Sequence, residues 1–262
     1  MTGGRLLIRG TRRMVHAFGL VLGLLATAVA ASVTVLPPAA AVTPSGAALF
    51  GSVTTAYTSN AEPIHGQQFK IVGQVFLVLG DSPTPMPNQT VTLERGDSPS
   101  GPWAAVATAE TAEATLPNGE KHIMYSFDVT ARRTAWFRVR YDGMPDSEAI
   151  APSRSDDGDA TPIRVRVHRQ MPIRLAQPRA GGVFLVGIAR PDYAYQRVAV
   201  LRSRCPKKCA WRPYATRLTD ARGRYRVELT VPRGRTRFFV ARSRASSGFA
   251  VSYSQPAKIT AG

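Results

Sequence analysis

One order of sequence motifs occurs twice in this chain. The first copy contains Q-T-V-T-L-E-R from Gln89, then W-x-x-V-A-T, Y-S-F-D-V and T-A-W-F-R-V-R-Y, which ends at Tyr141. The second copy begins about one hundred residues later, at Gln196, with Q-R-V-A-V-L-R. It continues with W-x-x-Y-A-T, Y-R-V-E-L and T-R-F-F-V-A-R. Because a repeat of that length is the size of a small domain, the 262-residue chain is predicted to contain two similar domains.

Apolar and polar residues alternate with a period of two through both copies, and no long segment has the period of an α-helix. The predicted strands are Leu49–Thr58, Gln67–Leu79, Gln89–Arg95, Trp103–Ala109, His122–Val129, Trp136–Tyr141, Ser147–Pro152, Ile163–Val167, Gly182–Ala189, Gln196–Ser203, Trp211–Leu218, Arg224–Val231, Thr236–Ser243 and Phe249–Ile259. Because the connections are short and contain no crossover helix, we expect an all-β fold of two tandem antiparallel β-sandwiches.

The motifs of both copies also resemble a known kind of module. V-T-L-E-R, G-P-W-x-x-V-A-T and W-F-R-V-R-Y, repeated as V-A-V-L-R, W-R-P-Y-A-T and F-F-V-A-R, are similar to bacterial immunoglobulin-like or fibronectin-type repeats of secreted actinobacterial proteins. The resemblance covers residues 65–260. It implies immunoglobulin-like sandwiches that serve as spacers, adhesive units or carbohydrate-associated units, with no catalytic residue to transfer. The first copy departs from the pattern, because it inserts Thr115–His122 where the second has the turn Asp220–Gly223.

The N-terminal segment has the composition of a targeting signal. Four arginines lie in the first thirteen residues, Phe18–Ala31 is apolar, and A-x-A sequences follow at Ala28–Ala30 and Ala39–Ala41. We expect a secretory signal cleaved near residue 31 or 41. The alternative is an uncleaved anchor, because Ala17–Leu36 has no charged residue and is long enough to span a bilayer. Either way, the protein is predicted to be secreted or exposed at the cell surface.

Charge divides the two copies sharply. The chain has a net charge of +17, but residues 42–162 hold 8 basic and 14 acidic side chains, whereas residues 163–262 hold 22 and 3. The predicted organisation is therefore a signal peptide or signal anchor (1–41), an acidic sandwich (42–162) and a strongly basic sandwich (163–262). One interpretation of the basicity is arginine-rich codon usage at solvent-facing positions. The other is attraction toward an anionic polymer, a membrane surface or an acidic partner.

If the attraction is real, ten basic side chains of the second copy are the candidate binding surface. They are Arg197, Arg202, Arg204, Lys207, Lys208, Arg212, Arg217, Arg222, Arg224 and Arg226. The expected partner is an anionic cell-envelope polymer or an acidic protein. No motif indicates specific nucleic-acid recognition, and membrane attachment is expected only through an uncleaved N-terminal anchor.

The two cysteines, Cys205 and Cys209, are predicted to form a disulfide within a hairpin loop of the second copy. In an exported protein an even, closely spaced pair indicates a structural bridge. The C-x-x-x-C spacing is not that of the C-x-x-C redox motif, and two thiols without nearby histidines cannot complete a zinc site.

Three further motifs each have a structural and a functional interpretation. Arg95–Asp97 matches an integrin-recognition tripeptide, but its residues are also those of an ordinary turn. Asp156–Asp159 could ligate calcium, but it lacks the ligand spacing of a calcium loop, so a solvated acidic linker is favoured. Trp103 and Trp211 could stack on sugars. Because they recur at matching positions, they are predicted to be core residues instead.

No arrangement of residues points to catalysis. His65, His122 and His168 are far apart in sequence, and no G-x-S-x-G or H-E-x-x-H motif frames them. We therefore expect no catalytic residue, no metal site and no cofactor. The predicted function is non-enzymatic binding through the basic second module. A purely structural spacer or adhesion module is the alternative, and a carbohydrate-binding or hydrolytic enzyme is the least favoured class.

Overall fold

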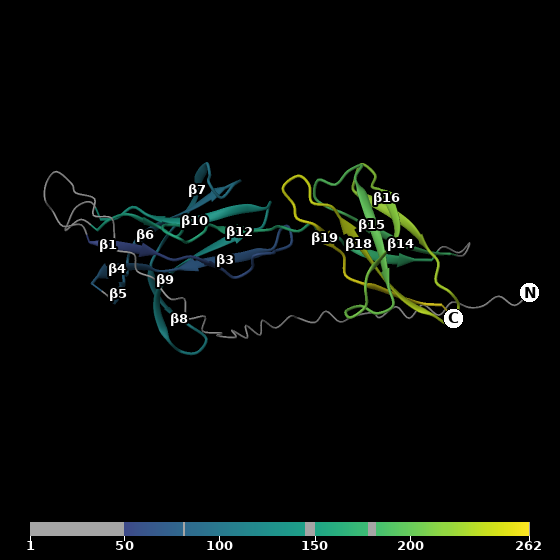
Figure 1. Cartoon of the computed structure of the whole chain (residues 1–262), viewed down its shortest axis with the longest axis horizontal. Coiled ribbons are helices and arrows are strands. Elements are labelled where there is room, and N and C mark those ends of the chain that lie inside the picture. The colour runs from purple at the N-terminus through teal and green to yellow at the C-terminus, as the bar shows by residue number, and fades with distance from the viewer. Residues whose placement is uncertain (1–49, 81, 145–149, 178–181, 262) are drawn as a thin grey trace, which may run out of the picture.

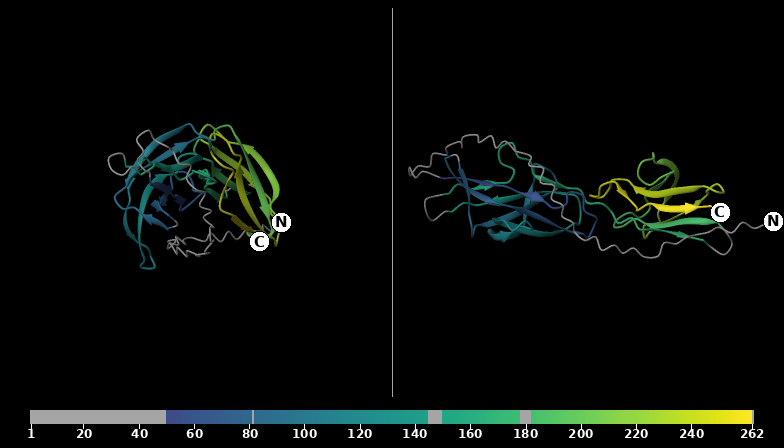
Figure 2. Two further views of the ribbon diagram at one scale, coloured as in Figure 1. Left: turned by 60° about the vertical axis from the view of Figure 1, so that its left-hand side comes forward. Right: turned by 90° about the horizontal axis from the view of Figure 1, so that it is seen from below.

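The computed structural model describes residues 50–80, 82–144, 150–177 and 182–261, and these residues contain strands but no helix. The strands form two β-sandwiches that lie end to end along the long axis of the molecule (Figures 1 and 2). The predicted N-terminal signal lies outside the described residues, as does the first half of the predicted strand Ser147–Pro152. Within the described part, no helix could span a membrane.

The first half contains twelve described strands. They are β1 (Gly51–Thr54), β2 (Tyr57–Thr58), β3 (Gln68–Gly73), β4 (Val75–Leu79), β5 (Ser82–Pro85), β6 (Thr90–Gly96), β7 (Trp103–Glu110), β8 (Ala112–Thr115), β9 (Lys121–Thr130), β10 (Ala135–Tyr141), β11 (Ser153–Arg154) and β12 (Ile163–Val165). One sheet has the order β2-β3-β9-β8 and the other β11-β10-β6-β7, with β12 beside β10. A small third sheet, β1-β4-β5, extends the sandwich.

The second half contains eight described strands. They are β13 (Ile173–Ala176), β14 (Val183–Ile188), β15 (Arg197–Ser203), β16 (Arg212–Leu218), β17 (Arg224–Leu229), β18 (Thr236–Ser243), β19 (Ser252–Tyr253) and β20 (Ala257–Thr260). One sheet has the order β13-β14-β17 and the other β16-β15-β18-β19, with β20 beside β18. All pairs between named strands in both halves are antiparallel.

The repeated motifs occupy equivalent places in the two sandwiches. β6 and β15, β7 and β16, β9 and β17, and β10 and β18 hold equivalent positions in their sheets, except that β9 also pairs with β8, which has no counterpart beside β17. The sheet orders are those of immunoglobulin-like domains. Period-two burial explains why these segments are strands: along β10, Ala135, Phe137 and Val139 are buried while Arg138 and Arg140 face outward. The predicted all-β, tandem immunoglobulin-like fold is therefore confirmed.

A glycine and a tyrosine face each other across the same strand pair in each half. Gly73 pairs with Tyr125 between β3 and β9, and Gly187 pairs with Tyr225 between β14 and β17. Both tyrosines are buried, as expected of residues shared by the copies. A side chain at either glycine would overlap the facing tyrosine ring, so the ring packs where only glycine leaves room.

Each sandwich has its own hydrophobic core. The first core includes Val165 and Val167, which follow the predicted boundary at residue 163, and Phe249, which comes from the loop after β18. β12 likewise pairs with β10 of the first half. The segment that joins the halves is thus packed into the first sandwich, while the exact domain boundary stays a prediction.

Several strand boundaries differ from the sequence prediction. The segment predicted as one strand, Gln67–Leu79, is broken at Gln74, whose backbone and side chain bond to Thr55 and Ile123. β4 therefore leaves β9 and pairs with β1 and β5. The last predicted strand, Phe249–Ile259, is two strands, because Pro256 has no N–H with which to continue the ladder. The strands β5, β8, β11 and β13 were not predicted.

Candidate functional site

All ten predicted basic side chains are exposed in the structure. They lie on β15 and β16, in the hairpin between these strands, on β17, and in the turn before β17. The hairpin is closed by the predicted disulfide between Cys205 and Cys209, which the structure confirms with the two Cα atoms 5.4 Å apart. Lys207 and Lys208 lie inside this closed loop and face solvent. The bridge thus holds two cations at the end of a sheet.

The structure brings the basic residues together in two groups, one on each sheet. Arg202 and Arg212 are direct partners across β15 and β16, beside the disulfide loop. Arg224 and Arg226 lie on the outer face of β17 in the other sheet, where the guanidinium carbon of Arg226 is 3.6 Å from the ring centroid of Phe184. Arg222 adjoins this second group in the Asp220–Gly223 turn. The surface therefore has two cationic faces.

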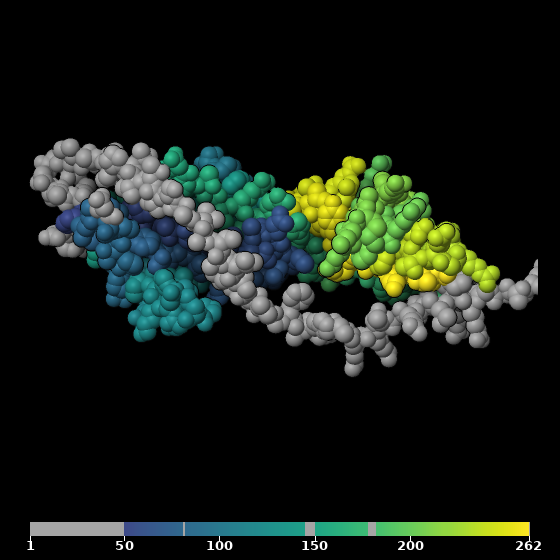
Figure 3. Space-filling view, turned by 60° about the horizontal axis from the view of Figure 1, so that its bottom comes forward, coloured from purple at the N-terminus to yellow at the C-terminus, as the bar shows by residue number. Residues whose placement is uncertain are grey.

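The two halves differ in how their charges are balanced. In the first half most cations have a carboxylate partner: Lys70 with Asp128 at 2.9 Å and Lys121 with Glu113 at 2.8 Å are examples. None of the ten candidate side chains lies within 4.0 Å of a carboxylate among the described residues. The second half, drawn in green to yellow, is a lobe beside the first in the space-filling view (Figure 3). Its ten candidate cations are exposed.

A network of ion pairs covers the outer face of the first half's β6 and β10. Arg138 Nε is 2.7 Å from Glu94 Oε2, and Arg138 Nη1 is 3.5 Å from Asp156 Oδ2. Arg140 Nε lies 3.0 Å from Glu94 Oε1. Asp156 is only 14% exposed, so the segment predicted as a solvated acidic linker contributes a partly buried carboxylate. No group of three metal-binding side chains occurs in the described residues.

The prediction that Trp103 and Trp211 are core residues is wrong, because both are half-buried at the surface. They lie at the start of β7 and just before β16, which are edge strands, so one side of each lacks a covering strand. The ring of Trp103 packs over Gly96 and Gly101, and the guanidinium carbon of Arg138 lies 4.4 Å from its centroid. The recurrence of tryptophan therefore indicates an equivalent position in the two sandwiches, but that position is at the surface.

The tripeptide Arg95–Asp97 has the structural role that turn chemistry predicted. Arg95 Nη2 is 3.3 Å from Asp97 Oδ1, so the two charges bind each other instead of pointing to opposite ends of a loop. The following residues form a tight turn in which the N–H of Gly101 donates to the carbonyl of Ser98.

Two of the histidines considered above, His65 and His168, approach each other, but without a serine, threonine or cysteine nucleophile. The N–H of His65 donates to the carbonyl of His168, whose Nε2 lies 3.8 Å from Glu62 Oε2. The shallow hollow beside His168 is lined by Glu62, Arg166, His168, Arg242, Arg244, Val251 and Tyr253. No serine, threonine or cysteine is among these lining residues, so the hollow offers none of the usual nucleophiles of a catalytic triad.

The joint between the halves is built around Arg169, which the sequence analysis missed. Its side chain is 1% exposed, and its guanidinium donates to the carbonyls of Pro191 and Ser246 at 3.0 and 2.7 Å. The rings of Tyr193 and Phe249 lie 4.7 and 4.5 Å from its central carbon. Burial lowers the pKa of Arg169, because the charged form loses hydration. Period-two alternation with the buried Val165 and Val167 was the signal that could have identified it.

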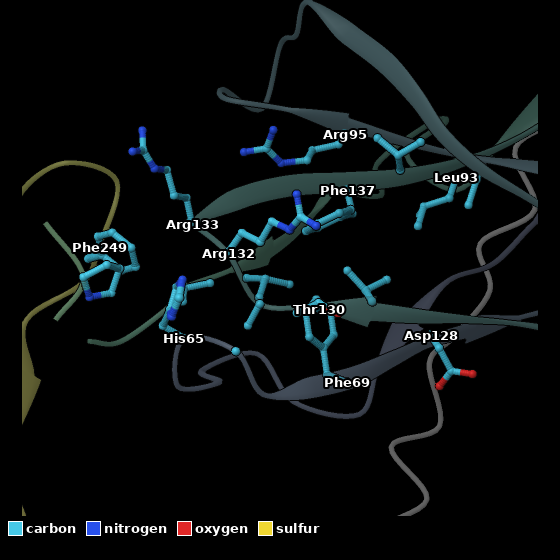
Figure 4. Close-up of a pocket in the computed structure, with 18 of the residues that line it drawn as sticks. His65, Phe69, Leu93, Arg95, Asp128, Thr130, Arg132, Arg133, Phe137 and Phe249 are labelled. Carbon is cyan, nitrogen blue, oxygen red and sulfur yellow. The ribbon is translucent and has the colours of Figure 1, made fainter. Parts of the chain in front are cut away.

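A hollow of about 840 Å³ opens on the first half next to this joint (Figure 4). Its floor is apolar and includes Phe69, Leu93 and Phe137 from three strands of the sandwich. Arg95, Arg132 and Arg133 extend near one end of it, and Asp128 lies apart from them in the same view. Arg133 pairs with Asp192 of the second half at 3.1 Å. No sequence motif predicted this hollow.

Comparisons with known proteins show no matching family model and no matching curated protein. Among solved structures, the chain is similar to the chicken interferon gamma receptor alpha chain, with 12% identity over 79% of this chain and 97% of that one and a TM-score of 0.41. A tandem-repeat region of a large adhesion protein matches with 15% identity over 81% and 49%, and a TM-score of 0.29. The Yersinia pseudotuberculosis adhesin InvE matches with 16% identity over 80% and 58%, and a TM-score of 0.26. The chain spans about half the length of these two adhesion proteins.

Proposed function

We propose that the protein is a non-enzymatic, exported binding protein whose second module attaches to an anionic polymer of the cell envelope or to an acidic protein. The observation that carries the proposal is the charge balance of the second half: ten exposed cations on two faces, none within 4.0 Å of a described carboxylate. Exposed like charges held near each other repel in the compact state. A polyanion that binds there relieves that repulsion.

The alternative, in which the first half neutralises the basic face, is not favoured by the ten candidate side chains, because none of them pairs with a described first-half carboxylate. Arg166, which pairs with Glu62 at 2.9 Å, lies outside this surface. In the Arg133–Asp192 pair the cation comes from the acidic half and the carboxylate from the basic half, which is the reverse of what neutralisation of the basic half requires. Asp192 is one of only three acidic residues after residue 162, so this contact leaves the second half more positive at its outer faces.

Two further observations fit export and attachment. The Cys205–Cys209 disulfide is expected of a protein that folds in an oxidising compartment, in agreement with the N-terminal signal composition. At the joint, Phe249 packs into the first core and the N–H of Thr134 donates to the carbonyl of Gly248, so the basic module is fixed to the first sandwich. The first half therefore serves as a support that holds the basic module away from whatever anchors the chain.

Titration of the full chain with long-chain polyphosphate and with polyglutamate tests the proposal. Affinity is expected to fall steeply as NaCl rises, because exposed charges are screened over a Debye length of about 8 Å at physiological ionic strength. A neutral dextran is the matched control and is expected not to bind. Affinity that does not change with salt, or equal binding of dextran, would contradict an electrostatic function.

A further inference from the structure

The strand β7 has a free edge that lacks the usual protection. β7 pairs with β6, and no described strand pairs with its other side. Residues 104–108 are exposed and uncharged. The equivalent strand of the second half, β16, carries Arg212, Pro213 and Arg217, which are residues that block the addition of another strand. The two copies thus differ at one edge, and only the edge of β7 is open.

The hollow described above borders β7. Val106 and Ala107 of β7 line one side of it, and Asp128, Val129 and Thr130 of β9 line the other. Ala107 pairs with the core residue Leu93, and the register shifts between Leu93 and Glu94. A small alanine at an inward position next to this bulge leaves the space between the two sheets unfilled. The hollow is therefore continuous with the open edge.

The shape of the hollow favours an extended ligand over a compact one. Its floor residues Phe69, Leu93 and Phe137 are already 4%, 1% and 5% exposed, so little apolar surface remains for a deeply inserted group. A strand added to β7 would instead gain backbone hydrogen bonds along the edge. Its alternate side chains would cover the gap between β7 and β9.

Charge at one end of the hollow sets the direction of such a strand. Arg95 pairs with Ala104 near the start of β7, and Arg132 and Arg133 lie at the same end of the sandwich, next to the second half. Arg132 has no carboxylate within 4.0 Å among the described residues. An antiparallel strand would place its C-terminal end beside the start of β7. An acidic residue or a free carboxylate there would meet the guanidinium of Arg132, whereas Arg95 and Arg133 already pair with Asp97 and Asp192.

We propose that β7 and the adjoining hollow bind an extended peptide segment of a partner protein, added antiparallel to β7. The segment has apolar side chains at alternate positions and an acidic C-terminal end that pairs with Arg132. This site lies on the first half and is separate from the cationic faces of the second. It gives the protein a second, protein-binding contact besides its attachment to a polyanion.

Fluorescence anisotropy with the full, disulfide-intact chain tests the site. The probe is a labelled peptide T-V-T-L-T-V-T-E with a free C-terminus, and the control is E-T-V-T-L-T-V-T with an amidated C-terminus. The first is expected to bind at least about tenfold more tightly, because only it places carboxylates beside the arginines. Amide exchange of residues 104–108 is expected to slow when it binds. Equal affinity of the two peptides, or unchanged exchange, would overturn the proposal.

Three variants separate this site from general electrostatic attraction. Arg132→Glu is expected to weaken the peptide about tenfold or more, and Ala107→Leu is expected to do the same by filling the hollow. Arg222→Glu, which makes the same charge change on the second half, is expected to leave peptide affinity unchanged. Equal losses in Arg132→Glu and Arg222→Glu would contradict strand addition. Arg132 is exposed in a loop, so its variant tests the site even if Ala107→Leu fails to fold.

The same variants keep the two proposals distinct. Arg132→Glu is expected to retain polyphosphate binding, since that function belongs to the second half. Loss of peptide binding with polyphosphate binding intact supports the site on β7. If the native chain binds polyphosphate but neither peptide, the proposed site on β7 is wrong, whereas the proposal of polyanion binding still holds.

Discussion

The central guanidinium carbon of Arg169 lies 4.5 Å from the ring centroid of Phe249, and both side chains are buried where the two sandwiches meet. Phe249 belongs to the core of the first half although it follows β18 of the second. Arg169 in turn donates to carbonyls of the second half at Pro191 and Ser246. The chain thus crosses the joint twice, and one buried cation connects both crossings.

Replacing Arg169 with alanine is expected to destabilise the protein by about 3 kcal/mol, because the carbonyls that it satisfies would be left buried without a donor. Urea unfolding followed by tryptophan fluorescence measures the change. Arg174→Ala removes an exposed arginine of β13 and is expected to shift stability by less than about 0.5 kcal/mol. Equal effects of the two substitutions would show that Arg169 has no structural role at the joint.

Gly187→Ala is expected to destabilise the second half by more than about 2 kcal/mol, because the added methyl group would overlap the hydroxyl of Tyr225 and lie 2.9 Å from Ile173 Cγ2. Gly51→Ala is the matched control in a strand, since its nearest neighbour is Val78 Cβ at 3.7 Å. Thermal unfolding of the two variants checks the difference. A Gly187→Ala protein as stable as Gly51→Ala would rule out the tight glycine–tyrosine packing.

The equivalent tyrosines of the two halves are expected to respond differently to loss of the hydroxyl. Tyr125 donates to the carbonyl of Thr55, whereas the buried hydroxyl of Tyr225 has no partner among the described residues. Tyr125→Phe is therefore expected to cost about 1–2 kcal/mol, and Tyr225→Phe to be neutral or stabilising. Chemical denaturation of each single variant decides this. A larger loss for Tyr225→Phe would refute the hydrogen-bond assignment.

The turn before β17 is expected to be sensitive to acid. Asp220 Oδ1 accepts from the N–H groups of Arg224 and Arg222, both at 2.8 Å, and these bonds lower the pKa of Asp220 below its ordinary value of 3.8. The ionised carboxylate therefore stabilises the fold at pH values above the pKa of Asp220 in the unfolded chain. This contribution is lost as the pH falls through the lower pKa of Asp220 in the folded protein. Asp220→Asn is thus expected to be less stable than the native protein at about pH 6 but nearly equal to it at about pH 2. A stability difference that does not change with pH would contradict this.

The repeat allowed much of the fold to be predicted, because residues that two copies share include the framework. Tyr125 and Tyr225 recur in the two copies, and both are buried. The same reasoning failed for Trp103 and Trp211. Burial on an edge strand depends on which strands lie beside it, and the order of strands in a sheet cannot be deduced from the repeat. Arg169 was missed because the composition of the second half does not distinguish one buried arginine from the many exposed ones.

The candidate sites were less predictable than the fold. The ten basic residues could be identified from charge alone, but their division between two sheets follows from strand pairing across long sequence separations. The hollow beside β7 exists because the side chain of Ala107 is small and because residues of both halves pack around it. Neither has a local sequence signature.

The measurement that tests the central proposal most directly compares polyphosphate affinity of the full chain in two variants with the same change of net charge. Arg212→Gln removes an exposed cation of the second half, and Lys121→Gln removes one of the first half that pairs with Glu113 at 2.8 Å. The unpaired charges of the second module predict that Arg212→Gln weakens binding several-fold and lowers its salt dependence, while Lys121→Gln changes neither. Equal affinities of the two variants and the native protein would contradict the proposed function.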